Sequence, residues 1–387
     1  MVRGESTGMR STILGAGEAA RTPAADRTAI DLAVEASLAA VADAGIELGR
    51  VDGLVTGYSL TENHLDFSGS LAESLGIAPQ WSQTISRSGA TGASTVVDAA
   101  LAVSGGVCDT ALAVWADNRR SRPPADVAGL LAGQLSEFET INGPLIATQY
   151  ALIAQSYVDR WRAGLEDLAA VAVQFRRHAS LNAHARHREP ISVEDVLASP
   201  VASSPLHVLE CALITDYGGA VVVTRPELAA AAVDPVVILG AGEALSHQSI
   251  LRNPALFTTG ETAGAESAAR AHTMAGTRPA DIRSAQIYDC FTITVLMLLE
   301  DFGFAPRGGA GEFVRGGGLD RDGAFPVNTN GGMLSCASGG ILHVTEAVAQ
   351  MRGRAGGHQL ATRPETSLVH GNGGILGAQT TLILGQG

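Results

Sequence analysis

One heptapeptide occurs twice in this chain of 387 residues. Residues 13–19 read Ile-Leu-Gly-Ala-Gly-Glu-Ala, and residues 238–244 repeat the same seven letters. β-Branched residues stand immediately before both copies, which predicts a strand at each place. A repeat of this kind indicates duplication. We therefore expect two related halves, residues 1–230 and 231–387.

Both halves follow one order of predicted elements. A helix follows the repeat (26–44 or 261–275), then a second strand, then a glycine-rich turn that opens a buried helix. Two short strands close each half, namely 110–116 with 218–224 and 367–370 with 379–384. Because strands and helices alternate, we expect an α/β fold built in layers.

The first half contains a long segment, about residues 119–209, that lacks strand periodicity. It begins with an arginine- and proline-rich stretch, and helices are predicted near 146–163 and 165–177. Long segments inserted into a regular domain more often contain functional residues than residues of the hydrophobic core. We interpret this segment as an inserted loop domain, and residues 225–235 as the linker between the halves.

Composition excludes several classes of protein. A net charge of −13 argues against nucleic acid as a partner. All 26 basic residues are arginine, and Schiff-base chemistry requires a lysine amine. The Gly-x-Gly of each repeat lacks the third glycine of a dinucleotide fingerprint, and no apolar run reaches the roughly 20 residues of a membrane span.

The four cysteines form no CxxC pair, and residues 1–5 show no signal sequence. These features predict a cytoplasmic protein. The histidine spacing does not suggest a metal site, and we expect no cofactor bound by the chain itself.

Arginine and histidine concentrate in one part of the inserted domain. The candidates for ligand binding there are Arg176, Arg177, Arg186 and Arg188. The guanidinium group of arginine can donate two parallel hydrogen bonds, which suits the phosphates of a ligand such as coenzyme A. The alternative is an ordinary solvated surface.

Three segments of the second half carry candidate active-site residues. Residues 287–292 end a strand, where α/β folds place ligands, and include Tyr288, Asp289 and Cys290. Residues 328–340 are rich in glycine, which allows close backbone approach to a ligand. Residues 368–374 present His370, which titrates near pH 7. The candidates in the last two segments are Asn330, Gly331, Gly332, Ser335, Cys336, Ser338, His370, Gly373 and Gly374.

Each of these segments also has a purely structural interpretation. Tyr288 and Cys290 fit a core, with Asp289 as a helix cap. The glycine-rich loop could be a tight crossover connection with no ligand. His370 could be a buried histidine whose ring is hydrogen-bonded within the core.

Several motifs together resemble the thiolase superfamily, in its sterol-carrier-protein branch. They are Arg-His-Ala-Ser-Leu-Asn at 177–182, Asp-Tyr-Gly-Gly-Ala at 216–220, Tyr-Asp-Cys-Phe at 288–291, Asn-Thr-Asn-Gly-Gly at 328–332 and His-Gly-Asn-Gly-Gly at 370–374. The resemblance spans nearly the whole chain. It implies a five-layered αβαβα fold of two duplicated halves with an inserted loop domain, and a homodimer.

The chain departs from the thiolase pattern at the catalytic positions. Gly89 stands where these enzymes carry a nucleophilic cysteine, and Tyr288 stands where they carry a histidine. The histidine of their Gly-His-Pro motif falls near Ser338, and their second cysteine near Val369. A tyrosine without a nucleophilic cysteine resembles the lipid-transfer-protein aldolases of steroid side-chain breakdown.

That resemblance implies retro-aldol cleavage of a β-hydroxyacyl-CoA thioester, with a small partner protein that carries an OB-fold and a zinc ribbon. It also implies a second tyrosine in the glycine-rich loop, where this sequence has Ser335, Cys336 and Ser338. The alternatives are an acyltransferase whose nucleophile has moved to Cys290 or Cys336, and a catalytically silent acyl-CoA-binding subunit.

Retro-aldol chemistry needs a proton acceptor for the β-hydroxyl and donors for the enolate. We assign Tyr288 as the acid/base group, with a pKa lowered from about 10 by neighbours, of which His370 is the expected one. The enolate would be held by main-chain groups of residues 330–333 and 373–374, aided by His343.

Overall fold

The computed structural model describes residues 9, 11–21, 26–133, 139, 141, 146–229 and 234–387. Both halves contain the predicted core elements. In the first half these are β1 (Thr12–Glu18), α1 (Ala29–Ala44), β2 (Gly53–Gly57), α2 (Phe67–Leu75), β3 (Trp81–Ile85), α3 (Thr91–Ser104), β4 (Thr110–Asn118) and β7 (Asp216–Thr224). In the second half they are β8 (Val236–Leu245), α11 (Gly264–Ala275), β9 (Ser284–Ile287), α12 (Thr292–Asp301), α15 (Leu342–Met351), β10 (Thr366–Gly373) and β11 (Ala378–Gln386).

The strand order confirms the duplication. The nine main strands run β3-β2-β4-β7-β1-β8-β11-β10-β9, so β2-β4-β7-β1 of one half matches β9-β10-β11-β8 of the other. The closing strands pair as predicted, β4 with β7 and β10 with β11, and both pairs are antiparallel. The two copies of the repeat lie on β1 and β8 and join the halves, since Thr12 pairs with Val237 and Ile13 with Val236.

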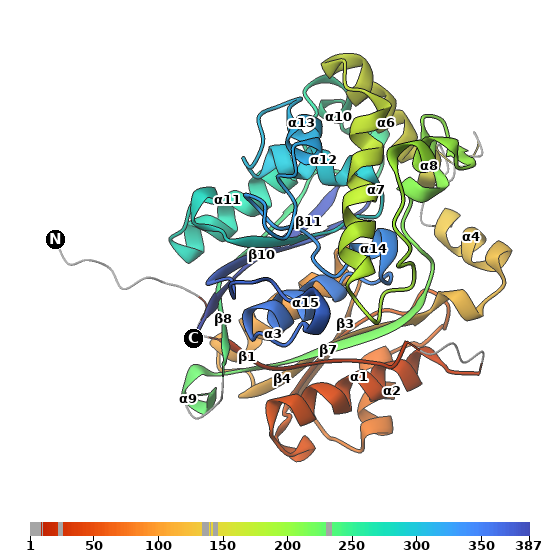
Figure 1. Cartoon of the computed structure of the whole chain (residues 1–387). Coiled ribbons are helices and arrows are strands. Elements are labelled where there is room, and N and C mark those ends of the chain that lie inside the picture. Colours follow the sequence, from red (N-terminus) through yellow and green to blue (C-terminus); the bar gives the residue numbers. More distant parts are fainter. Residues whose placement is uncertain are drawn as a thin grey trace.

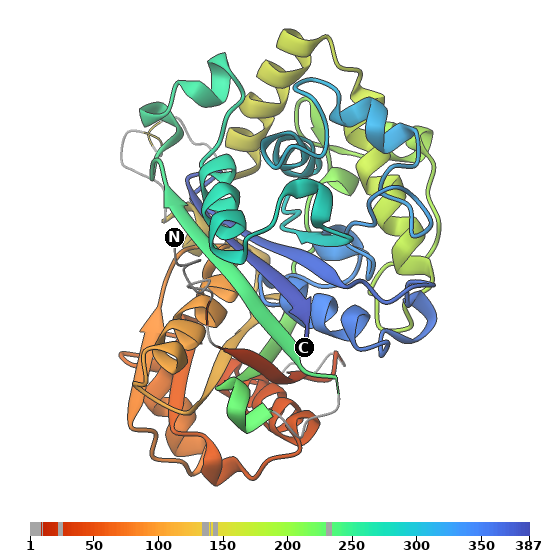
Figure 2. The same ribbon diagram turned by 90° about the vertical axis from the view of Figure 1, so that its left-hand side faces the viewer.

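The elements stack in five layers, α-β-α-β-α (Figure 1). The buried helices α3 and α15 lie in the middle layer between the two halves of the sheet. Helices α1 and α2 cover the outer face of the first half, and α11 and α12 cover that of the second. The long strands β8 and β11 cross the molecule side by side between the two lobes (Figure 2).

The glycines of the repeat have a packing role. A Cβ atom on Gly15 would lie 2.2 Å from the carbonyl oxygen of Ala40 in α1, and one on Gly240 would lie 2.4 Å from that of Ala271 in α11. Only glycine permits so close an approach of helix to strand. The repeat therefore forms the same helix–strand contact in both halves. This packing explains its glycines, and a nucleotide-binding role is not needed to explain them.

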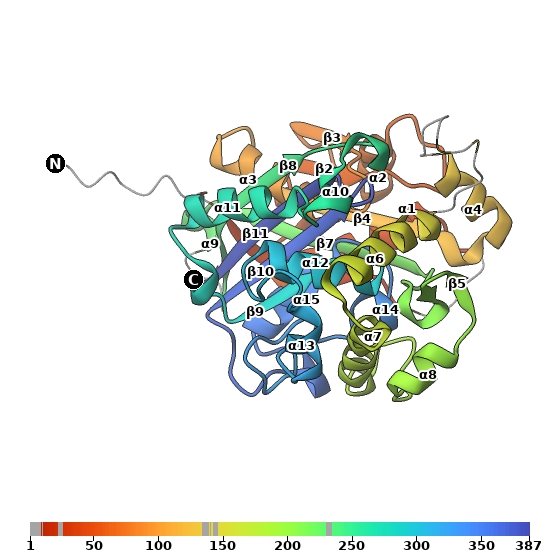
Figure 3. The same cartoon turned by 90° about the horizontal axis from the view of Figure 1, so that it is seen from above.

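The inserted segment is mainly helical, as predicted. It comprises α4 (Pro124–Ala132), α6 (Ile146–Trp161), α7 (Leu165–Ser180) and α8 (Val193–Ala198). It also contains a small ribbon of β5 (Val201–Ser203) and β6 (Leu206–His207), which the sequence analysis did not anticipate. Seen from above, α6 and α7 lie over the second half (Figure 3). They pack there against α12, α13 (Ala310–Arg315) and α14 (Gly332–Ser335).

The two remaining described α-helices are short. They are α9 (Pro226–Ala229) and α10 (Ala255–Thr258). The expected linker begins with α9, but residues 230–233 lie outside the described residues, so the domain boundary stays a prediction. In the described part of the chain, no helix is long and apolar enough to cross a membrane.

Candidate active site

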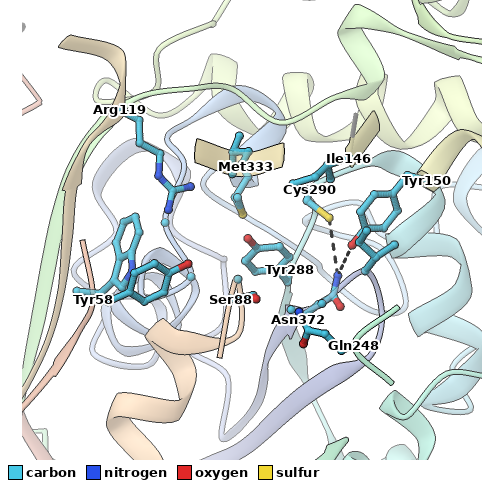
Figure 4. A pocket seen from close by; sticks show the side chains of 18 residues that line it. Tyr58, Ser88, Arg119, Ile146, Tyr150, Gln248, Tyr288, Cys290, Met333 and Asn372 are labelled. Atoms are coloured by element: carbon cyan, nitrogen blue, oxygen red, sulfur yellow. Dashed lines mark hydrogen bonds between the residues drawn. The ribbon is translucent and has the colours of Figure 1, made fainter. Parts of the chain in front are cut away.

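A cavity of about 120 Å³ lies where the two halves and the inserted segment meet (Figure 4). The residues that follow the carboxyl ends of β2, β4 and β9 contribute Tyr58, Arg119, Tyr288 and Cys290. The carboxyl ends of strands are where α/β folds form ligand sites. The remaining lining residues are Ser88, Gly89, Trp115, Leu131, Ile146, Tyr150, Gln248, Met333, Gly339, Gly340, Asn372, Gly373, Gly374 and Ile375.

Tyr288 follows β9 and faces the inner helical layer. Its main-chain N–H donates to the carbonyl of His370 at 3.2 Å, and its ring meets that of His343 edge to face, with centroids 5.9 Å apart. Burial raises the pKa of Tyr288 well above 10, and the Cys290 thiol adds to this, while the charge of Arg119 opposes it. The expected lowering of this pKa is wrong, so the resting group is a neutral phenol.

Gly89 leaves no room for a side chain. A Cβ atom there would lie 2.3 Å from the hydroxyl oxygen of Tyr288 and 2.3 Å from the carbonyl oxygen of Asn372. The phenol therefore occupies the space that a side chain at position 89 would need. A side chain at position 89 and the phenol of Tyr288 compete for the same space, so the glycine at 89 and the tyrosine at 288 depend on each other.

Arg119 is a site residue that the sequence analysis missed. It stands directly after β4, its Nε donates to Asp117 Oδ2 at 2.8 Å, and its guanidinium lies 5.3 Å from the ring centroid of Trp115. Its charge is opposed by burial but stabilised by Asp117, which raises the pKa of Arg119. The signal in the sequence is an arginine two positions after a strand aspartate, but the arginine- and proline-rich pattern that begins at Arg119 predicts only the start of the inserted segment.

A second group of polar residues lies on the side of the insertion. Asn372 Nδ2 donates to the hydroxyl of Tyr150 at 3.0 Å and lies 3.7 Å from Cys290 Sγ. Tyr150 stacks on Phe291 with centroids 4.4 Å apart. Burial raises the pKa of Cys290 to about 11, so its thiol stays protonated at neutral pH. Tyr150 and Tyr58 are further phenols that line the cavity, and both lie outside the glycine-rich loop in which the resemblance implied a second tyrosine.

His370 does not reach Tyr288. Side chains alternate along β10, and the side chain of His370 points to the outer face, where its ring lies 5.0 Å from that of Phe302. Burial lowers the pKa of His370 to about 3; the Gln379 amide nearby opposes this without forming a hydrogen bond. The expectation that His370 tunes the phenol is therefore wrong, because the sheet separates the two side chains.

Asp289 has a structural role. Its oxygens accept from the main-chain N–H groups of Met333 at 2.9 Å and Leu334 at 3.1 Å. His343 Nε2 lies 3.4 Å from Asp289 Oδ1, without hydrogen-bond geometry. The carboxylate thus holds the glycine-rich loop against the end of β9, and His343 packs behind Tyr288.

The same bonds alter the expected enolate site. The N–H of Gly332 donates to Asn330 Oδ1 at 2.8 Å and that of Gly331 to the carbonyl of Asn328 at 2.9 Å, while Met333 donates to Asp289. These three donors are engaged within the protein, so this part of the expected cradle is wrong. Gly373 and Gly374 do line the cavity.

Cys336 and Ser338 lie away from Tyr288. Cys336 Sγ accepts hydrogen bonds from Arg21 at 2.7 Å and Asn182 at 3.4 Å, and burial raises the pKa of its thiol to about 11. Ser338 Oγ accepts from the main-chain N–H of Thr215 at 3.1 Å. Neither side chain lines the cavity.

The four arginines of the predicted cradle are dispersed. Arg176 is buried and donates to Ser335 Oγ at 2.9 Å, Arg177 pairs with Asp320 at 3.2 Å, and Arg188 donates to the carbonyl of Ser180 at 3.3 Å. Only Arg186 lines a second, basic pocket of about 520 Å³. The other basic side chains of that pocket are Arg21, Arg27, Arg120 and His184.

The chain matches two family models, "Thiolase, N-terminal domain" over residues 12–197 and "Thiolase C-terminal domain-like" over residues 242–386. The chain belongs to the thiolase family. This confirms the resemblance and the five-layered fold that it implied.

Two curated relatives of this thiolase-family chain have names that describe carbon–carbon bond cleavage. The steroid side-chain-cleaving aldolase of Thermomonospora curvata is 32% identical over 367 residues, covering 89% of this chain and 90% of that protein. The 17-hydroxy-3-oxo-4-pregnene-20-carboxyl-CoA lyase of Mycobacterium tuberculosis is 33% identical, covering 89% and 92%.

Other relatives of this thiolase-family chain broaden the comparison. An acetyl-CoA acetyltransferase of Methanothermobacter thermautotrophicus is 28% identical, covering 92% of this chain and 94% of that one. Among solved structures, an Ltp2-ChsH2(DUF35) aldolase has a TM-score of 0.87 and 31% identity, covering 98% of both chains.

Proposed function

We propose that the protein is a carbon–carbon lyase that cleaves a β-hydroxyacyl-CoA thioester of a steroid or lipid side chain by a retro-aldol reaction. The observation that carries this proposal is the hydroxyl of Tyr288, which fills the space beside Gly89 where thiolases carry their nucleophile. The aldolase and lyase relatives support the same reaction.

A neutral phenol suffices for the proton transfers of this reaction. The β-hydroxyl loses a proton, the Cα–Cβ bond breaks, its electron pair moves toward the thioester oxygen as an enolate, and Cα gains a proton. The net change is one proton moved from oxygen to carbon within one substrate. A phenol that takes the β-hydroxyl proton in the same step in which it gives its own proton to Cα completes this transfer without ionising, which suits a buried tyrosine.

Acyl transfer by a relocated cysteine has less support. The thiolate is the reactive form of cysteine, and burial raises the pKa of both Cys290 and Cys336 to about 11. Position 89 has no room for a nucleophile. A catalytically silent acyl-CoA-binding subunit is the other alternative, and the cleavage assay below distinguishes it.

The phosphates of the coenzyme A moiety would bind in the basic pocket. Arg119 lines the cavity beside Tyr288, and the next residue, Arg120, lines the basic pocket, so the two sites are adjacent. In the part of the chain that the structure describes, neither Arg120 nor Arg186 forms an ion pair with a carboxylate. Free guanidinium groups of this kind favour phosphate.

The assembly is proposed to be a cytoplasmic homodimer that works with a small OB-fold and zinc-ribbon protein and needs no cofactor of its own. Strand β3 supports the dimer, because it is an edge strand of the nine-stranded sheet and its Ser82 and Thr84 are exposed. The Ltp2-ChsH2(DUF35) aldolase supports a partner. Light scattering with and without candidate partners tests both.

The decisive experiment compares the wild-type protein with Tyr288→Phe on a set of β-hydroxyacyl-CoA thioesters, with mass-spectrometric detection of ketone and shortened thioester. Loss of the phenol should lower kcat by about 10²- to 10⁴-fold with little change in KM. Cleavage within about threefold of wild type, far below that range, would remove Tyr288 from the mechanism. An acyl adduct on Cys290 or Cys336 would instead favour acyl transfer.

A further inference from the structure

The cavity beside Tyr288 has a strongly uneven distribution of charge. Among the described residues that line it, Arg119 is the one that carries a charge at neutral pH. The others are phenols, amides, glycines, apolar side chains and the protonated thiol of Cys290. A negative charge that develops here has no other full positive charge to stabilise it.

Arg119 is held in place by its immediate surroundings. Its Nε donates to Asp117, and Asp117 is fixed in turn by Ser59 Oγ at 3.0 Å and Thr61 Oγ1 at 2.6 Å. The guanidinium also lies over the Trp115 ring, which lines the same cavity. Anchoring at Nε and over the indole fixes the plane of the guanidinium, so its position costs little reorganisation during a reaction.

The two terminal nitrogens of Arg119 remain free. In the described part of the chain, its hydrogen bond to Asp117 uses Nε, and neither Nη atom has a partner. Figure 4 shows the guanidinium directed into the cavity on the side of Tyr58 and Tyr288. The N–H groups on Nη1 and Nη2 are therefore available to an oxygen atom inside the cavity.

The main-chain donors of the glycine-rich loop at residues 331–333 are already engaged. The N–H groups of Gly331, Gly332 and Met333 are engaged within the glycine-rich loop and with Asp289. Retro-aldol cleavage still requires donors at the thioester oxygen, because the electron pair of the broken Cα–Cβ bond moves there.

We propose that Arg119 is a catalytic residue whose Nη groups hold the thioester oxygen and stabilise the enolate. This inference rests on the proposed function. As the β-hydroxyl proton leaves and the Cα–Cβ bond breaks, the carbonyl oxygen gains the negative charge next to the guanidinium. Tyr288 takes the β-hydroxyl proton and gives its own phenol proton to Cα in the same step, which returns that oxygen to a neutral carbonyl.

The test uses two unreactive CoA thioethers. Carboxymethyl-CoA carries a carboxylate within one bond of the enolate oxygen position, and carbamoylmethyl-CoA has the same shape without charge. Calorimetric titration gives the ratio of their dissociation constants. We expect wild type to prefer the carboxylate by about 10- to 100-fold, the range of one charge-assisted hydrogen-bond pair. Arg119→Gln should reduce the ratio to near one and lower kcat by about 10²- to 10³-fold.

Two further variants keep the test decisive. Arg122→Gln is the matched control, because Arg122 pairs with Glu62 at 2.9 Å and does not line the cavity, so it should retain the preference. Arg119→Gln leaves the buried Asp117 unpaired, which threatens the fold. Asp117→Asn/Arg119→Gln removes both charges together and should give a folded protein without the preference.

The outcomes separate this inference from the proposed function. A preference for carboxymethyl-CoA that persists in the folded Arg119 variants would overturn the inference, whatever the reaction is. Loss of the preference in a protein that cleaves no thioester would support the oxyanion site and count against the retro-aldol proposal.

Discussion

The hydroxyl oxygen of Tyr288 lies 2.3 Å from the point where a Cβ atom on residue 89 would stand. Carbon and oxygen atoms that are not bonded do not approach so closely, so position 89 and position 288 exclude each other's larger side chains. A chain with a cysteine at 89 needs a smaller or differently placed group at 288. The loss of the thiolase nucleophile and the gain of the phenol therefore belong to the same change of chemistry.

Gly89→Ala tests this relationship directly. The added methyl group should displace Tyr288 and the backbone at Asn372, lower kcat by about 10²-fold, and destabilise the fold by about 1–3 kcal/mol. Gly49→Ala is the control, because a Cβ atom there has nothing within 4 Å. Steady-state kinetics and thermal unfolding measure both effects. Full activity in Gly89→Ala would contradict the placement of Tyr288.

The pH dependence of cleavage follows from the neutral phenol. Burial raises the pKa of Tyr288 above its usual value, so its proton should stay bound from about pH 7 to about pH 9.5. The rate of the chemical step, measured in single turnovers, should be level across this interval. A phenolate base would instead give a rate that rises about tenfold per pH unit below its pKa. Cys290, whose pKa is raised to about 11, does not interfere.

Much of the fold could be predicted from the sequence because it follows from periodicity and repetition. The heptapeptide predicted the duplicated halves, and the strands that carry it join those halves through Ile13 and Val236. The ribbon of β5 and β6 was missed, because strands of three and two residues are too short for a period to be visible.

The site was predicted less completely because its geometry depends on which face of a strand each side chain takes. Tyr288 directly follows β9 and His370 lies within the neighbouring strand β10, and only the register of the two strands places their side chains on opposite faces. Arg119 was missed because its role depends on Asp117, Trp115 and the packing of the second half. Contacts between residues so distant in sequence leave no local pattern.

His370 should affect acid stability and leave catalysis unchanged. Its pKa is about 3 in the native state and about 6.5 when unfolded, so the unfolded state binds the extra proton first. The stabilisation is complete above about pH 6.5 and declines as the pH falls toward 3, by up to about 1.4 kcal/mol per pH unit. His370→Phe removes this titration, so its free energy of unfolding should fall less steeply with acid.

Urea unfolding of both proteins at several pH values gives the comparison. His178, whose pKa burial lowers to about 4, is present in both and cancels in the difference. Parallel stability curves would contradict the burial of a neutral His370. A kcat that falls more than about tenfold in His370→Phe, a loss typical of acid/base groups, would return His370 to the mechanism.

Arg120 and Arg186 should contribute to the affinity for coenzyme A. Both line the basic pocket, and partial burial, together with the charge of Arg120, lowers the pKa of Arg186. The double variant Arg120→Gln/Arg186→Gln should raise the dissociation constant of an acyl-CoA by about 10- to 100-fold at low salt. The increase should be smaller at about 0.5 M salt, because screening weakens the contribution of both charges. Arg177→Gln is the control, because that side chain is exposed and paired with Asp320 outside this pocket.

The corresponding acyl-pantetheine has no phosphates, so its affinity should be the same for the wild-type protein and the double variant. An equal loss of affinity for acyl-CoA and acyl-pantetheine would show that the two arginines support the fold of the pocket and do not bind phosphate. An unchanged affinity for acyl-CoA would show that the phosphates bind elsewhere.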